Sequence, residues 1–272
     1  MKDLKSLILL PIIMILSLNL TGQDSPSKMT KEIGIQLGVS FAQVKEERFS
    51  ALTKKMIMPQ AALIFTRYND KRREQWELGY TTSRIKGQSN TLQYKIIRPE
   101  ITYNYQRQIK GHWVGAFFQS STLLNLPKSN LPGYVNNPIS YTINQSLGLS
   151  YSKSSQLHKT DNHVVNFDTE AKMALINYLI RPAYGHPYPD KFLQEKTFNP
   201  TKEGMGSAIA KSGKIKTVNK YQSFKVVLGI NYIHKDHLKL RVQYAFDMQN
   251  NIEHHSSRWL SNDLTVGVSY VY

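Results

Sequence analysis

The residue types that could carry out a reaction gather in one short segment near the C-terminus. His254 and His255 precede Ser256 and Ser257, and Glu253 stands directly before them. A serine becomes a nucleophile when a neighbouring histidine takes its proton and an acid orients that histidine. His254 with Ser256, or His255 with Ser257, would share one face of a strand. Because Glu253 need not reach either histidine, we treat the four residues as candidates and do not expect an enzyme.

Other motifs that could bind a cofactor or a metal are poorer. Gly204 and Gly206 have a spacing found in dinucleotide-binding loops, but no strand pattern precedes them. Five histidines stand beside expected turns, namely His112, His158, His163, His234 and His237. These places favour solvated turn residues over a metal cluster. The sequence therefore predicts neither a cofactor nor a metal.

The elements that would position these residues alternate between apolar and polar side chains. Leu264, Val266, Val268, Tyr270 and Tyr272 fall on one face at the end of the chain, with small residues between most of them. Period-two alternation is typical of a strand with one apolar face. Ten such strands are expected, at 33–44, 55–68, 73–84, 92–108, 112–124, 140–153, from 163, at 224–232, at 238–246 and at the C-terminus.

Three of these strands have a less certain facing. In 55–68, Ile57 and Leu63 on one face and Met58 and Ile64 on the other are equally apolar. Residues 112–124 also carry apolar side chains on both faces. The strand that starts at His163 loses its alternation near residue 174, which predicts either a bulge there or an extension of the strand beyond the membrane.

The connections between the strands differ in length in a regular way. Short links are expected at 69–72, 109–111, 154–162 and 235–236, and mostly longer ones at 45–54, 85–91, 125–139, 181–220 and 249–257. Short turns on one side and longer loops on the other are typical of membrane barrels. An even number of strands would place both termini on the periplasmic side, with the short turns.

The closing strand resembles that of Gram-negative outer-membrane β-barrels, including porin-like ones, in its apolar outer face, small inner residues and terminal Tyr272. The resemblance implies an all-β fold, a transmembrane antiparallel up-and-down barrel of about ten strands, with eight or twelve as alternatives. It implies that Tyr270 and Tyr272 form the signal read by the barrel-assembly machinery. It also implies residence in the cell outer membrane, against its lipid and lipopolysaccharide. Tyr105, Tyr151 and Tyr232 would join Tyr272 in an aromatic girdle.

The N-terminus predicts export. Lys2 and Lys5 precede an apolar run that ends at Leu20, so residues 1–22 are expected to be a signal peptide. Residues 23–32 would be a short periplasmic segment, and 33–272 the barrel, with a long extracellular loop at 181–220. The chain has no cysteine, which excludes a lipoprotein and a disulfide framework.

Charge is the remaining signal. The net charge is +16, which in a soluble protein would suggest nucleic acid, but the export signal argues against that partner. By their parity, the residues expected to point into the lumen are Arg73, Glu77, Arg98, Glu100, Asp168, Glu170, Lys172, Lys225, Lys239, Arg241 and Asp247. Mixed signs in a narrow tube favour an ionic network that closes it, and the surplus of cations leaves a weakly anion-selective path as the alternative.

The sequence therefore leaves three functions open. The first is a porin-like or passive structural component of the envelope, with a narrow charged lumen. The second is a surface binding or adhesion barrel that acts through the basic loops 181–220 and 125–139. The third is an outer-membrane lipid hydrolase that uses the His-x-Ser pair, which resembles the pair of lipid A deacylases. The pattern does not fix the oligomeric state.

Overall fold

The computed structural model describes residues 29–46, 50–86, 92–129, 140–181, 213–252 and 256–272. No helix in these ranges is long and apolar enough to cross a membrane. The described segments form eleven strands: β1 (Thr30–Glu46), β2 (Ser50–Tyr68), β3 (Arg72–Lys86), β4 (Leu92–Ile109), β5 (His112–Ser129), β6 (Ser140–Lys159), β7 (His163–Ile180), β8 (Lys214–Thr217), β9 (Tyr221–His234), β10 (Leu238–Asn251) and β11 (Ser257–Val271).

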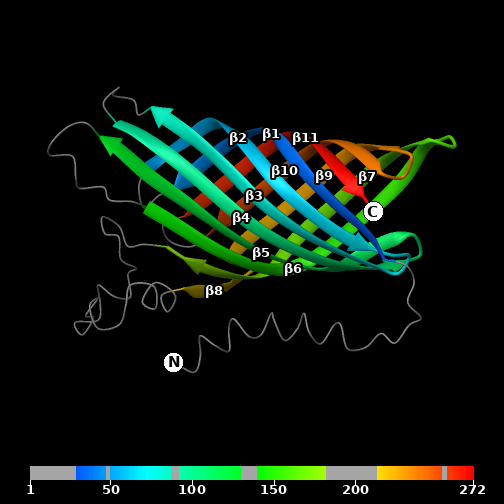
Figure 1. Cartoon of the computed structure of the whole chain (residues 1–272). Coiled ribbons are helices and arrows are strands. Elements are labelled where there is room, and N and C mark those ends of the chain that lie inside the picture. The colour runs from blue at the N-terminus through cyan, green and yellow to red at the C-terminus, as the bar shows by residue number, and fades with distance from the viewer. Residues whose placement is uncertain (1–28, 47–49, 87–91, 130–139, 182–212, 253–255) are drawn as a thin grey trace, which may run out of the picture.

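The strands make one antiparallel sheet that closes on itself (Figure 1). The strands of the ring pair in sequence order from β1 to β7, and β7 then pairs with β9 instead of with β8 alone. β9 pairs with β10, β10 with β11, and β11 with β1, which completes the ring. Ten strands form the wall, because β8 has only four residues and pairs only with the C-terminal part of β7, at Ile176–Leu179. The expected ten-stranded up-and-down barrel is confirmed.

The bulge expected in the seventh strand lies at Leu175. Leu147 pairs with Ile176 and Gly148 with Ala174, so Leu175 has no partner on β6. Both Leu175 and Ile176 are consequently exposed, at 36% and 46%. Beyond the bulge, β8 pairs with Ile176–Leu179 and continues the track of β9 along the same edge of β7.

The short links lie at one end of the barrel, together with the start of β1 and the end of β11. We call this end the short-turn rim. Two of its turns are tight hairpins with positive φ at both central residues: Lys110 and Gly111 in one, Lys235 and Asp236 in the other. The backbones of Lys31 and Tyr272 exchange two hydrogen bonds of 2.9 and 2.8 Å. The C-terminus lies at this rim in Figure 1.

The expected link at 154–162 is wrong, since β6 continues to Lys159 and the turn is only 160–162. The polar run that suggested a loop still pairs with β7, where Ser154 lies opposite Asp168. Other strands are also longer than expected: β1 begins three residues before Ile33, β2 begins at Ser50 and β5 reaches Ser129. Strands of 14 to 20 residues exceed the ~9–11 needed to cross the hydrocarbon core.

The outer face is apolar and exposed, as the alternation predicts. The C-terminal strand exposes Leu264 by 54%, Val266 by 59% and Val268 by 46%, while Ser269 is buried. The ambiguity in β2 is resolved, because Ile57 faces outward and Met58 is fully buried inside. The sheet closes around the ring, although β2 pairs with β3 only over Gln60–Tyr68, and its earlier residues pair with β1 alone. The apolar exterior suits contact with lipid. The molecule is a membrane-spanning β-barrel.

Candidate functional site

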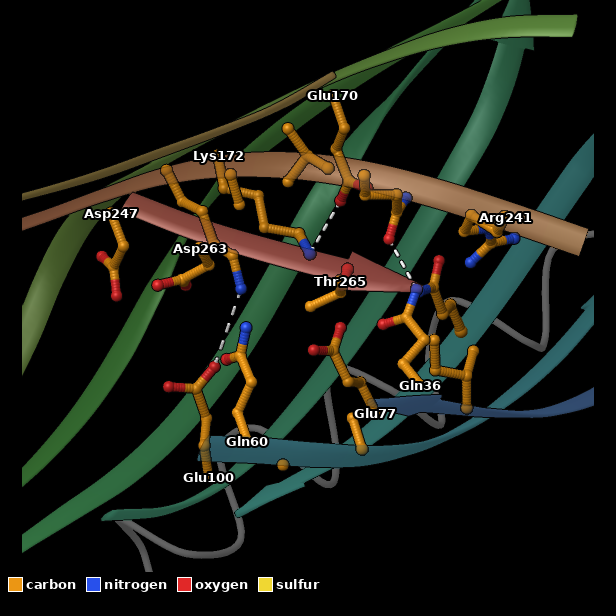
Figure 2. Close-up of a pocket in the computed structure, with 18 of the residues that line it drawn as sticks. Gln36, Gln60, Glu77, Glu100, Glu170, Lys172, Arg241, Asp247, Asp263 and Thr265 are labelled. Atoms are coloured by element: carbon orange, nitrogen blue, oxygen red, sulfur yellow. Dashed lines mark hydrogen bonds and ion pairs between the residues drawn. The ribbon is translucent and has the colours of Figure 1, made fainter. Parts of the chain in front are cut away.

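The inner face of the barrel gathers polar side chains from all sides around a cavity of about 110 Å³. In Figure 2, Glu170 and Lys172 on one wall and Glu77 and Glu100 on another point into the same space. Ten of the eleven lumen residues expected from the sequence line it: Arg73, Glu77, Arg98, Glu100, Asp168, Glu170, Lys172, Lys225, Arg241 and Asp247.

The best buried ionic group centres on Arg98. Its Nη2 lies 3.0 Å from a carboxylate oxygen of Glu100 on the same strand and 3.0 Å from Asp247 on β10. Lys225 on β9 approaches Glu100 from the other side, with 4.0 Å between Nζ and Oε1. Because the partners come from β4, β9 and β10, this group ties opposite parts of the wall together through the lumen.

A second group lies on β7. Lys172 Nζ is 2.7 Å from Glu170, and the Asn104 amide donates to the same carboxylate at 3.4 Å. Two positions before Glu170, the Asp168 carboxylate accepts from the Ser154 hydroxyl at 2.6 Å and from the Asn231 amide. The carboxylates are therefore held by neutral donors as well as by a cation.

A third group forms around Glu32, near the short-turn rim. Lys239 and Arg241 of β10 lie 3.1 and 3.2 Å from its two carboxylate oxygens, and Arg241 also donates to Asn231 at 2.9 Å. Lys239 therefore pairs here instead of lining the cavity. The sequence reasoning left Glu32 outside the barrel, although it continues the inward parity of Gly34 and Gln36.

Part of the lumen is apolar near the opposite end of the barrel, beside buried polar side chains that include Ser121, Asn144 and Gln249. Val44 pairs with Trp259 close to the point where β1 ends, next to the longer loops. We call the cluster there the apolar plug; it consists of Ala42, Val44, Met56, Met58, Ile96 and Trp259, with Leu123 packed against it. The Arg98 guanidinium lies 4.3 Å from the Trp259 ring centroid, a cation–π contact that joins the plug to the ionic groups. Sequence reasoning did not identify this cluster.

The charges around the cavity balance. Its lining has six cations, Arg73, Arg98, Lys153, Lys172, Lys225 and Arg241, and six anions, Glu77, Glu100, Asp168, Glu170, Asp247 and Asp263. The expected surplus of lumen cations is therefore wrong for this cavity. Asp263, which the sequence reasoning missed, follows the inward parity of Thr265, so the alternation could have identified it.

The remaining predicted residues are the His-Ser candidates and the tyrosines of the expected girdle. His254 and His255 lie outside the described residues, Ser256 directly precedes β11, and Ser257 is its first residue. Among the expected girdle tyrosines, Tyr151 and Tyr272 are exposed on the outer face, at 38% and 54%. Tyr105 is instead covered, at 8%, and accepts a hydrogen bond from Arg107.

The sequence matches no protein-family model and no curated protein. The fold is similar to that of the outer membrane protease OmpT from Escherichia coli, at 10% identity and a TM-score of 0.43, over 93% of this chain and 99% of that one. It is similar to the translocator domain of the autotransporter NalP from Neisseria meningitidis, at 8% and 0.39, over 99% and 96%. For the attachment invasion locus protein Ail of Yersinia pestis the values are 9% and 0.31, over 89% and 98%.

Proposed function

We propose that this β-barrel of the Gram-negative outer membrane is a closed, structural component of the envelope, not an open pore. The observation that carries the proposal is the arrangement inside the barrel, where three ionic groups and the apolar plug follow one another along the lumen.

The two kinds of barrier oppose solute passage for different reasons. An ion in the apolar plug would lose its hydration without gaining a partner, and hydrophobic constrictions exclude water. The ionic groups are occupied by one another, because Arg98, Glu100 and Asp247 satisfy each other at 3.0 Å. With equal numbers of cations and anions around the cavity, the lumen also lacks the field that would select one sign of solute.

Conductance in planar bilayers tests the proposal. We expect the wild-type protein to be silent and the double variant Met58→Gly/Trp259→Ala to open, because it removes two side chains of the plug. The matched control is Ile57→Ala, on the same strand but with its side chain 63% exposed toward lipid. Stable openings of the wild-type protein would overturn the proposal and favour the porin-like alternative.

A second candidate function is anion binding at the cell surface. The whole chain carries a net charge of +16, whereas the charges around the cavity cancel, so the excess cations lie elsewhere. Loops rich in lysine would attract lipopolysaccharide phosphates or acidic surface polymers. We expect replacement of Lys191, Lys196, Lys202 and Lys211 by glutamine to weaken binding to immobilised lipopolysaccharide while leaving a folded barrel. Unchanged binding would count against this function.

A further inference from the structure

We propose that His163 and His234 form a binding site for a divalent metal ion of the zinc type at the short-turn rim. The two residues are direct partners on the neighbouring strands β7 and β9. Their Nδ1 atoms lie 3.3 Å apart, and the ring centroids are 5.0 Å apart. Neither the closed lumen nor the basic loops use this pair.

The separation suits a tetrahedral ion. Two imidazole nitrogens at 2.0–2.1 Å from Zn²⁺ are roughly 3.3 Å apart when the angle at the metal is tetrahedral. An octahedral or square-planar ion would need the nitrogens closer together, by roughly 0.4 Å. The observed 3.3 Å therefore favours zinc, or another ion that accepts four ligands.

The protonation of the two rings decides whether their nitrogens can bind a metal ion. His163 Nδ1 has two partners, the Tyr232 hydroxyl at 2.6 Å and His234 Nδ1 at 3.3 Å. Either ring nitrogen can be the donor in the contact between the imidazoles, because the tautomer decides the roles. When both rings carry their proton on Nε2, both Nδ1 lone pairs are available to a metal ion, and neither imidazole loses a proton on binding.

A third donor atom lies at the same place. The Tyr232 hydroxyl is 2.6 Å from His163 Nδ1, and the two rings are stacked with centroids 5.7 Å apart. An oxygen this close to a ligating nitrogen would subtend roughly 80° at the metal, too small for a tetrahedral ion, so the hydroxyl is placed to hold a metal-bound water. Within the described ranges, no group of three or more histidine, cysteine, aspartate or glutamate side chains could hold a metal ion. The remaining positions therefore go to water, which indicates a site open to exchange instead of a closed structural one.

The pair is distinguishable from other histidines at the same rim. His112 and His237 each stack on a tyrosine, Tyr151 and Tyr270 respectively. His112 Nδ1 is within 2.8 Å of the Tyr151 hydroxyl, and His237 Nδ1 is 3.2 Å from the Val271 carbonyl oxygen. Among the described residues, neither of these two makes a hydrogen bond or ring contact with a second imidazole, so they are matched controls.

The test is a zinc titration of the full-length barrel in detergent, with ZnCl₂ in competition with a chromogenic chelator. The protein carries His254→Gln and His255→Gln, which remove the one pair of adjacent histidines in the sequence. We expect one zinc ion per barrel. Because loss of one arm of a chelate typically weakens binding by ~10²-fold or more, His163→Gln and His234→Gln should each have an effect of about that size.

His237→Gln should bind zinc as the parent protein does. Heat-modifiable gel migration checks that each variant is folded, so that a loss of affinity cannot come from unfolding. Equal zinc affinity in all three variants would show adventitious binding to surface histidines and overturn the proposal. The same conclusion would follow if the parent bound no zinc in this competition.

Discussion

At the residue scale, Arg98 is the side chain that connects buried carboxylates of the lumen to the apolar plug. It contacts Glu100, Asp247 and the Trp259 ring, and its side chain is only 9% exposed. A buried charge of this kind adds little net stability over an apolar replacement of the whole group, but its removal leaves its partners unpaired.

We therefore expect Arg98→Ala to destabilise the barrel by about 3–5 kcal/mol, since buried Asp247 would lose its cation and Glu100 would keep only Lys225 at 4.0 Å. Urea unfolding in detergent micelles measures the change. Arg84→Ala is the control, because Arg84 is exposed on the same barrel and should change stability by less than ~0.5 kcal/mol. A triple variant with Glu100→Gln and Asp247→Asn should recover part of the loss. Equal stability of Arg98→Ala and the parent would show that the contacts of Arg98 with Glu100 and Asp247 do not contribute to the stability of the barrel.

Glycine at a close strand contact gives a second residue-scale prediction. A Cβ at Gly148, opposite the β7 bulge, would lie 2.1 Å from the Met173 carbonyl oxygen, whereas one at Gly79 would meet nothing nearer than 3.7 Å. Gly148→Ala should therefore cost about 1–3 kcal/mol by overpacking, and Gly79→Ala should be close to neutral. Unfolding midpoints of the two variants compare them directly. If Gly79→Ala were the more harmful, the β6–β7 register described above would be wrong.

At the element scale, the strands fall into two classes of predictability. Where the interior is polar, as in β9, β10 and β11, alternation alone gives the position and facing of the strand. In β2 and β5 the pattern fails because Met56, Met58 and Leu123 face an apolar interior, so both faces of these strands are apolar. The contrast on which a period-two argument depends disappears where the plug forms.

Which lumen charges meet each other could not be predicted in the same way. The parity places Arg98 and Asp247 inside, but their contact depends on how far the strands are staggered around the ring, which no single strand encodes. The ends of the elements were also missed, since polar residues such as Ser154 extend strands beyond the membrane. Glu32 and Asp263 continue visible alternations and could have been found.

The closing strand supplies the element-scale prediction. Val268 is 46% exposed on the outer face, and Ser269 is buried on the inner one. Val268→Lys should cost about 2–4 kcal/mol if it lies near the membrane midplane, and less toward an interface, while Ser269→Ala should be mild. Deletion of Tyr272, the proposed assembly signal, should harm insertion more than the stability of the finished barrel.

The amount of membrane-inserted, heat-modifiable protein measures these effects. If Ser269→Ala were the most harmful of the three changes, the inward and outward faces assigned to this strand would be wrong. An insertion yield unaffected by loss of Tyr272 would remove the proposed role of that residue in recognition by the assembly machinery.

At the scale of the whole molecule, the proposed function requires an interior that is closed to solutes. The strands close into a ring, the cavity charges cancel, and the plug lies toward the longer loops. The central claim is that nothing crosses the lumen from the side of the longer loops.

Cysteine accessibility tests this claim most directly, because the chain contains no cysteine of its own. Thr265 lines the cavity beneath the plug, and Ser257 lies at the start of β11 beside the longer loops. In intact cells treated with a membrane-impermeant maleimide, Ser257→Cys should react and Thr265→Cys should stay unlabelled until the barrel is denatured. Rapid labelling of folded Thr265→Cys from outside would show an open path through the plug and contradict the account.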